Sequence, residues 1–186
     1  MSLPYYTHFS RFENHKKTDY IRRKSCAKIA LCNFANSKGD FPLNAETCLA
    51  ILRDVYKGNQ FISYCGITID AVKCGEATLS LVVDDTKHTN QYGFTHGGAL
   101  EALADIALGV ACATVGKRVM TLSFNMNFIK NIHAGEKATA VAVVRHNGHR
   151  TMVVDVDTVT DDGALMTRTT ATMFVRDRYD NIPEQW

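Results

Sequence analysis

The chain has 186 residues, of which 46% are hydrophobic and 22% charged, as in an ordinary globular domain and unlike a disordered or fibrous protein. The formal net charge of +2 does not indicate a nucleic-acid binder, and no apolar run is long enough to span a membrane. The six cysteines lack the spacing of a zinc site. Because the first residues are polar and lack the apolar core of a secretory signal, we expect free thiols in a cytoplasmic protein without a metal.

Residues 1–45 are expected to form an N-terminal extension to a body that spans residues 46–186. Lysine and arginine outnumber acidic residues in the first part of this extension, and residues 20–34 have the composition of a helix. The simplest interpretation is a helical cap that faces solvent. Contact with an anionic lipid and a clamp on a phosphorylated ligand are the alternatives.

The body is predicted to open with a short helix and a hairpin. Asn44 is placed to cap a helix that ends at Gly58. Apolar and polar residues then alternate over residues 67–72 and 78–83. Two alternating segments joined by a short polar stretch predict a β-hairpin.

A long apolar helix is predicted in the middle of the chain. A polar loop over residues 84–98 leads into residues 99–116, where Asp105 is the sole charged residue between Ala102 and Gly116. A helix of this composition is expected to be buried on most of its faces. Four segments rich in β-branched residues follow: 119–129, 138–145, 151–160 and 165–175. One long helix among antiparallel strands is an α+β architecture.

The segment that begins this long helix carries the predicted chemistry. Gly97 and Gly98 leave backbone N–H groups unpaired at a helix start, where the helix dipole adds positive potential, and such a site suits an oxyanion. A lone carboxylate such as Asp105 in an apolar helix is costly unless it has partners or a function. It can act as a nucleophile or as a general base toward water. From these residues alone, a simple turn at the glycines and a structural hydrogen bond for Asp105 stay open.

The sequence also resembles a known family. The segments HGGALEALADIALG, TLSFNMNFIKNIHAGE and AVVRHNGHRTMVVDVDTVTDDGALMTRTTATMFV are similar to the PaaI-like clade of hotdog-fold thioesterases, over about residues 60–176. The resemblance implies a curved antiparallel sheet wrapped around one long helix, which agrees with the α+β architecture above. It also implies a homodimer, often doubled to a homotetramer, with the active site at the subunit interface and no cofactor.

Five residues match catalytic positions of that family. Asp105 matches the catalytic acid, and Gly97 matches the residue whose backbone N–H polarises the thioester carbonyl. Asn90 matches an asparagine that places the water or substrate, and His96 matches the histidine of the motif. Ser123 matches a serine or threonine of the following strand that assists the water in some relatives.

Substrate binding is expected to use cations and exposed N–H groups, because the phosphates of CoA require them. In the family, the strand near residue 130 and the hairpin near residues 145–150 lie close to the nucleotide. The candidates are Gly98, Lys130, Arg145, His149 and Arg150.

The resemblance implies an acyl-CoA thioesterase that releases a free acid and CoA. A non-catalytic acyl-CoA-binding hotdog domain is the first alternative, although such a domain would not need Asp105. A dehydratase of β-hydroxyacyl thioesters is the second, and its clade uses a proline-containing motif that Thr95-His96-Gly97-Gly98 lacks. The acyl group, the choice between CoA and an acyl-carrier protein, and the role of Asp105 as nucleophile or base stay open.

Overall fold

The computed structural model describes residues 43–186, and the structural statements below concern this part of the chain. The predicted N-terminal extension therefore lies outside the described residues, except for its last three. No helix of the described part is long and apolar enough to cross a membrane. The same part contains no cluster of three or more His, Cys, Asp or Glu side chains that could hold a metal ion.

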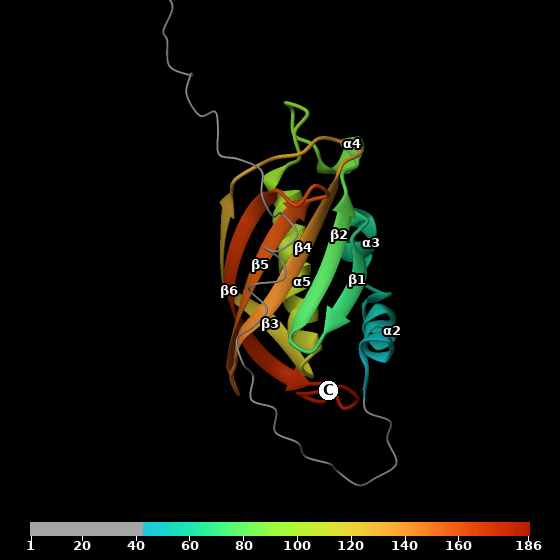
Figure 1. Cartoon of the computed structure of the whole chain (residues 1–186), viewed down its shortest axis with the longest axis vertical. Coiled ribbons are helices and arrows are strands. Elements are labelled where there is room, and N and C mark those ends of the chain that lie inside the picture. Colours follow the sequence, from blue (N-terminus) through green and yellow to red (C-terminus); the bar gives the residue numbers. More distant parts are fainter. Residues whose placement is uncertain (1–42) are drawn as a thin grey trace, which may run out of the picture. The chain divides into compact units, whose positions relative to one another are not determined.

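The domain is built from both helices and strands (Figure 1). Its helices are α2 (Ala45–Tyr56), α3 (Gln60–Cys65), α4 (Asp85–His88) and α5 (Gly97–Ala113). Its strands are β1 (Thr68–Lys73), β2 (Glu76–Val82), β3 (Lys117–Phe128), β4 (Lys137–Asn147), β5 (Thr151–Thr160) and β6 (Leu165–Arg178). The predicted short helix, hairpin, long helix and four later strands are all present, whereas α3 and α4 were not predicted.

The strands form a single six-stranded sheet in the order β1-β2-β4-β5-β6-β3. Every neighbouring pair is antiparallel. The strand after α5 therefore crosses to the far edge of the sheet, so that β1 and β3 are its two edge strands. An antiparallel sheet with one long helix confirms the α+β architecture predicted from the sequence.

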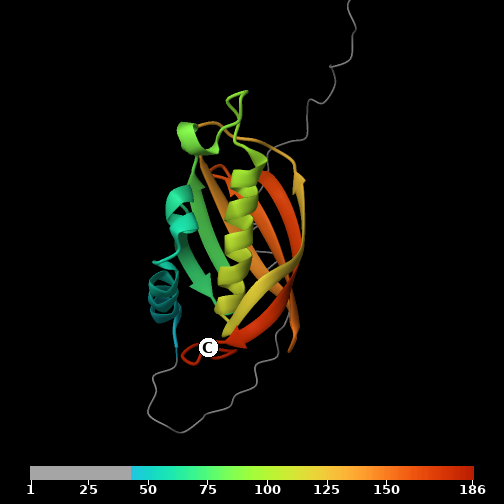
Figure 2. The ribbon, with the colours of Figure 1, turned by 180° about the vertical axis from the view of Figure 1, so that it is seen from behind.

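Helix α5 lies across the concave face of the curved sheet, as Figure 2 shows from behind. Its Leu103 and Leu108 side chains are fully buried against the sheet. The facing positions of β4 are Ala138, Ala140 and Ala142, each with 0% of its surface exposed. Because alanine side chains are short, they let the helix approach this strand closely, and the core is filled by the larger residues on either side.

The C-terminal segment packs over the end of α5. The indole N–H of Trp186 donates to the Thr114 carbonyl oxygen at 2.6 Å, and Ile182 is 3% exposed. Between them and the helix, Gly116 adopts a φ of 73°. A Cβ atom at Gly116 would overlap the carbonyl oxygen of Ile182. The turn into β3 therefore requires glycine both for its backbone conformation and for space.

Replacing Gly116 with alanine is expected to lower the free energy of unfolding by about 2–4 kcal/mol, because the left-handed conformation and the overlap both destabilise the folded state. Urea denaturation measures the change. Gly163→Ala is the matched control, because Gly163 has a φ of 79° and no atom within 4 Å of an added Cβ. The free energy of unfolding of Gly163→Ala is expected to fall by about 1–2 kcal/mol. An equal decrease in both variants would contradict a role for the overlap with Ile182.

Candidate active site

The side of α5 that turns away from the sheet is an open polar stripe. Gly98, Glu101 and Asp105 are exposed along it, while Leu103, Ala104, Ala107 and Leu108 are fully buried. The prediction that most faces of the helix are buried is confirmed, and this stripe is the exposed remainder. Asp105 contacts solvent and is not enclosed by the subunit that carries it.

Asp105 is held by a side chain of the edge strand β3. The Thr121 hydroxyl donates to Asp105 Oδ1 at 2.7 Å. Within residues 43–186 this is the one hydrogen bond that the carboxylate accepts. The bond fixes one carboxylate oxygen and leaves the other able to accept a proton from water or to approach a substrate.

The hydroxyl at Asp105 belongs to Thr121, and the predicted Ser123 lies on the other face of the sheet. Thr121 is paired with the buried Met173 of β6, whereas Ser123 is paired with Thr172, one residue away on that strand. Directly paired residues share a face of the sheet, so the two hydroxyls point in opposite directions. In a regular strand residues 121 and 123 would share a face. A register shift between them reverses the alternation.

His96 forms the N-cap of α5. Its Nδ1 accepts a hydrogen bond from the Gly98 N–H at 3.0 Å, and its own backbone N–H donates to the His88 carbonyl at 2.6 Å. Because Nδ1 acts as an acceptor, the proton of the neutral ring is on Nε2. The Gly98 N–H is thereby occupied, which argues against the predicted role of Gly98 as a donor to substrate.

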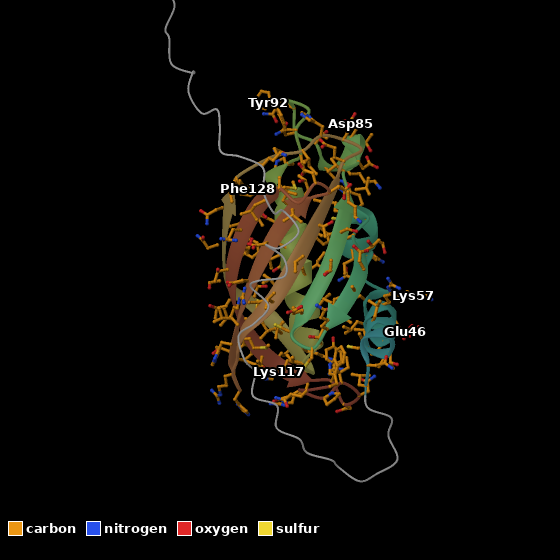
Figure 3. All side chains as sticks on the ribbon, in the orientation of Figure 1. Glu46, Lys57, Asp85, Tyr92, Lys117 and Phe128 are labelled. Atoms are coloured by element: carbon orange, nitrogen blue, oxygen red, sulfur yellow. The ribbon has the colours of Figure 1, made fainter. Side chains whose placement is uncertain are left out.

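The Gly97 N–H takes part in no hydrogen bond among the described residues. It is the first N–H of α5, where no helical acceptor exists and the helix dipole is positive. The aromatic ring of Phe128 lies beside it, 3.2 Å from the place that a Cβ at Gly97 would take. Figure 3 shows Phe128 at one end of β3 and Lys117 at the other. Gly97 thus offers an unused donor beside an apolar ring.

Asn90 organises the loop that precedes α5. Its side-chain Oδ1 accepts from the backbone N–H groups of Tyr92 at 2.9 Å and Phe94 at 3.2 Å. The Asn90 backbone N–H donates to the Phe94 carbonyl at 2.8 Å. Because the side-chain oxygen is occupied, the remaining group of the Asn90 amide is its NH₂, which can only donate. Any ligand atom that binds this side chain must therefore be an acceptor.

The buried side chain of His88 helps to hold the same loop in place. His88 is 4% exposed, and its Nδ1 accepts from the Asp84 N–H at 2.9 Å. Burial lowers the pKa of His88; the charge of Asp84 opposes this effect and that of Lys87 adds to it. The ring therefore stays neutral near pH 7 and keeps its acceptor. His88 was not predicted from the sequence, since one histidine in a polar loop gives no signal of burial.

The predicted CoA-binding cations do not meet in one subunit. Lys130 follows the Phe128 end of β3, whereas His149 and Arg150 lie in the β4–β5 turn, which is level with the opposite end of that strand. Arg145 donates to Asp155 Oδ2 at 2.9 Å, so its guanidinium already has a carboxylate partner. Lys130, His149 and Arg150 are exposed.

Comparison with known proteins agrees with this architecture. The family model of the Thioesterase superfamily matches residues 92–167. Acyl-coenzyme A thioesterase PaaI of Escherichia coli (strain K12) is 31% identical over 105 residues, which cover 56% of this chain and 74% of that protein. The chain belongs to the PaaI-like family of hotdog thioesterases. As a member of this family it is a thioester hydrolase.

Solved structures of PaaI-like thioesterases share the fold. The E. coli PaaI protein matches with a TM-score of 0.67 at 25% identity, covering 71% of this chain and 95% of that chain. A hypothetical thioesterase from Streptococcus pneumoniae TIGR4, solved with coenzyme A, matches with a TM-score of 0.63 at 28% identity, covering 67% of this chain and 99% of that chain.

The S. pneumoniae thioesterase has also been solved with alanine in place of an aspartate and, separately, in place of a threonine. In that protein the threonine follows the aspartate by 16 residues, which is the separation of Thr121 from Asp105 here. That thioesterase and this chain therefore have an aspartate and a threonine at the same spacing, which draws attention to Thr121 independently of its hydrogen bond.

Thr121→Val is expected to lower thioesterase activity, measured as released thiol, by about 10-fold or more, because a hydrogen bond to a charged group contributes about 1.5–3 kcal/mol. Valine keeps the shape of threonine and removes the donor to Asp105. Ser123→Ala is the matched control, and we expect it to retain wild-type activity. A larger loss in the Ser123 variant than in the Thr121 variant would reverse the assignment.

Proposed function

We propose that this protein hydrolyses acyl-CoA thioesters to a free acid and CoA. The observation that supports the proposal best is Asp105, an exposed carboxylate held by Thr121 on the open side of α5. The unused Gly97 N–H at the start of the same helix supplies a donor for an oxyanion. The E. coli relative is an acyl-CoA thioesterase, and the S. pneumoniae relative was solved with coenzyme A, so CoA is the expected carrier.

The proposed reaction starts with a water molecule near the free oxygen of Asp105. Asp105 takes a proton from this water while the oxygen of the water attacks the thioester carbonyl carbon. The resulting oxyanion accepts hydrogen bonds from the Gly97 N–H and the Asn90 amide. Collapse of this intermediate breaks the carbon–sulfur bond, and the departing CoA thiolate takes the proton from Asp105. A direct attack by Asp105, giving an anhydride that water then opens, uses the same groups.

The supporting residues keep these groups in place. Thr121 holds one oxygen of Asp105, so the other oxygen keeps a fixed direction. His96 caps the helix through Gly98, which keeps the neighbouring Gly97 N–H pointing out of the helix end. An oxyanion donor contributes about 10²–10³-fold, and a general base about 10²–10⁴-fold. Together with positioning of the substrate, these contributions account for an enzymatic rate without another reactive group.

The spacing along α5 supports an active site shared by two subunits. Gly97 and Asp105 are eight residues apart, which is about 12 Å along a helix. The donor must lie about 3 Å from the oxyanion, and the attacking atom about 3–3.5 Å from the carbonyl carbon. One thioester therefore cannot reach both groups in one subunit. We infer that Asp105 of one subunit acts with Gly97 and Asn90 of the partner subunit.

The edge strand β3 supplies the surface for this pairing. Its outer edge has no neighbouring strand in the described chain, and an unpaired edge promotes association. Met120 and Leu122 of β3 are 59% and 60% exposed, and Ile129, which follows the strand, is 58% exposed. A homodimer that joins two β3 strands covers this surface. Doubling to a homotetramer stays a prediction from the resemblance.

A two-fold axis makes the paired β3 strands antiparallel. The Phe128 end of one subunit then lies beside the Lys117 end of the other. In that arrangement Lys130 of one subunit and the turn with His149 and Arg150 of the partner subunit approach one another, although they are apart within one chain. We propose these three cations for the phosphates of CoA. Arg145, which already pairs with Asp155, is the weaker candidate.

Asp105→Asn is expected to lower the release of thiol from acyl-CoA by at least about 10²-fold, because it removes the general base or nucleophile. Glu101→Gln is the matched control. Glu101 is an exposed carboxylate one turn earlier on the same stripe, and we expect its loss to leave the rate near that of the wild type. Binding of acyl-CoA without turnover in the wild-type protein would favour a non-catalytic binding domain instead.

Gly97→Pro is expected to abolish most activity, because proline lacks the N–H proposed as the oxyanion donor. A proline is tolerated at the first position of a helix, and the ψ of 135° at His96 is compatible with a following proline. Gly97→Ala is the control, since it introduces the same Cβ beside Phe128 but keeps the N–H. We expect a smaller loss in that variant.

Mixing the Gly97→Pro and Asp105→Asn proteins after unfolding and refolding is expected to restore activity that neither has alone. In a mixed dimer, one active site combines the two intact groups and the other combines the two defects. Thiol release and the sedimentation of the mixture are measured together. An active monomer, or a mixture no more active than its components, would contradict the shared site.

A further inference from the structure

A polar cavity lies toward the C-terminal end of α5, away from Gly97. Its volume is about 140 Å³, and Gly109 and Val119 line its apolar side. The rest of the wall is formed by Tyr56, Lys117, Arg118, Arg176 and Tyr179. These residues come from α2, β3, β6 and the segment that follows β6. The proposed mechanism uses none of them.

The cavity adjoins Asp105. Gly109 follows Asp105 by one helical turn, about 5.4 Å along the helix axis. Val119 precedes Thr121 by two residues and packs against the core on the same face of β3. Gly109 and Val119 therefore both lie on the same side of the Asp105–Thr121 pair, toward the C-terminal end of α5. A group bound there is separated from the reacting carbonyl by only a few atoms.

The guanidinium groups of the cavity are incompletely neutralised. Arg118 donates to Asp177 Oδ1 at 2.9 Å, and Arg176 donates to Asp177 Oδ2 at 2.8 Å. Hydrogen bonds from both arginines lower the pKa of Asp177, so this carboxylate is ionised. One negative charge faces two positive charges. The neighbouring Lys117 is satisfied separately, by the Gly148 carbonyl at 2.9 Å and by Glu184 at 3.7 Å.

Tyr56 adds a neutral donor. Its hydroxyl takes part in no hydrogen bond within the described chain and lies 3.5 Å from the place that a Cβ at Gly109 would take. Burial raises the pKa of Tyr56, and the nearby charge of Asp105 is among the further causes. The hydroxyl therefore keeps its proton at neutral pH and can donate to a bound group.

We propose that this cavity binds the distal end of the acyl group and selects short acyl groups that end in a carboxylate. Arg118, Arg176 and Tyr56 present donors to that end, and two of them are cations, which favours an anionic acceptor over a neutral one. The volume is close to the roughly 150 Å³ of a cavity that holds benzene, which is enough for the end of a short acyl chain such as a glutaryl group. The inference rests on the proposed function, because it takes Asp105 as the reacting group.

The phosphates of CoA are the other anions of the substrate, and their proposed ligands His149 and Arg150 lie close to this cavity, because Lys117 of its wall donates to the Gly148 carbonyl of the same turn at 2.9 Å. The phosphates are at the far end of the pantetheine arm from the sulfur atom, whereas the Gly109 side of the cavity lies one helical turn from Asp105. The acyl chain extends from the carbonyl in the opposite direction to the sulfur. Closeness to Asp105 therefore favours the acyl side of the thioester, and binding of free CoA to the wild type and to the Arg176 variant separates the two sources of charge.

The test compares glutaryl-CoA with hexanoyl-CoA, whose neutral chain has a similar length. We expect the wild-type kcat/KM to be at least about 10-fold higher for glutaryl-CoA, the factor that one charge-assisted hydrogen bond supplies. Arg176→Gln is expected to reduce this preference about 10-fold and to leave the kcat/KM for hexanoyl-CoA unchanged. Arg168→Gln is the control, because Arg168 is another exposed arginine of β6 that pairs with an aspartate, Asp157, at 2.8 Å and does not line the cavity.

Calorimetry with the Asp105→Asn protein measures the same preference without turnover, using glutaryl-CoA, hexanoyl-CoA and free CoA. Tighter binding of glutaryl-CoA that Arg176→Gln removes supports the inference. Equal binding of the two thioesters, or a loss of free CoA binding in the Arg176 variant, overturns it. If no thioester is hydrolysed by the wild-type protein and the binding preference persists, the proposed function fails while the assignment of the cavity stands.

Discussion

The hydrogen bond from Thr121 to Asp105 joins the edge strand of the sheet to the central helix at 2.7 Å. Its length depends on two larger arrangements: α5 must lie close to the sheet, and β3 must curl around the open side of the helix. The first follows from short side chains on β4 and the second from the crossing of the chain to the far edge of the sheet. The direction of the carboxylate is thus a property of the whole domain.

The same helix explains why a single subunit is incomplete. A helix is stiff, so its start and its middle keep a fixed separation, and the donor at Gly97 cannot move toward Asp105. Pairing through β3 solves two problems together: it covers an unpaired strand edge with its exposed apolar residues, and it brings the start of one α5 toward the middle of another. Association and catalysis are then properties of one interface.

The sequence predicted the architecture well, because its signals are regular. An apolar helix and alternating strands can be recognised from periodicity alone. Asp105 and Gly97 drew attention because a charge is rare in an apolar helix and a helix start presents free N–H groups, while their catalytic roles come from the resemblance and stay predictions. The contact of Thr121 with Asp105 was not predicted, and Ser123 was named instead, because the register shift in β3 depends on pairing with β6 and leaves no local signal. The cavity near Arg176 was missed since its lining comes from α2, α5, β3, β6 and the segment after β6, which are far apart in the sequence.

The alanine row of β4 has a consequence for how this protein tolerates change. Ala138, Ala140 and Ala142 lie under α5 with no exposed surface, so each added methyl group must be accommodated by lifting the helix. A lift of a few tenths of an ångström is small for a folded domain but large for a short contact between a hydroxyl and a carboxylate. Substitutions in the interior of the sheet, far from any substrate, are therefore expected to lower catalytic activity before they unfold the domain.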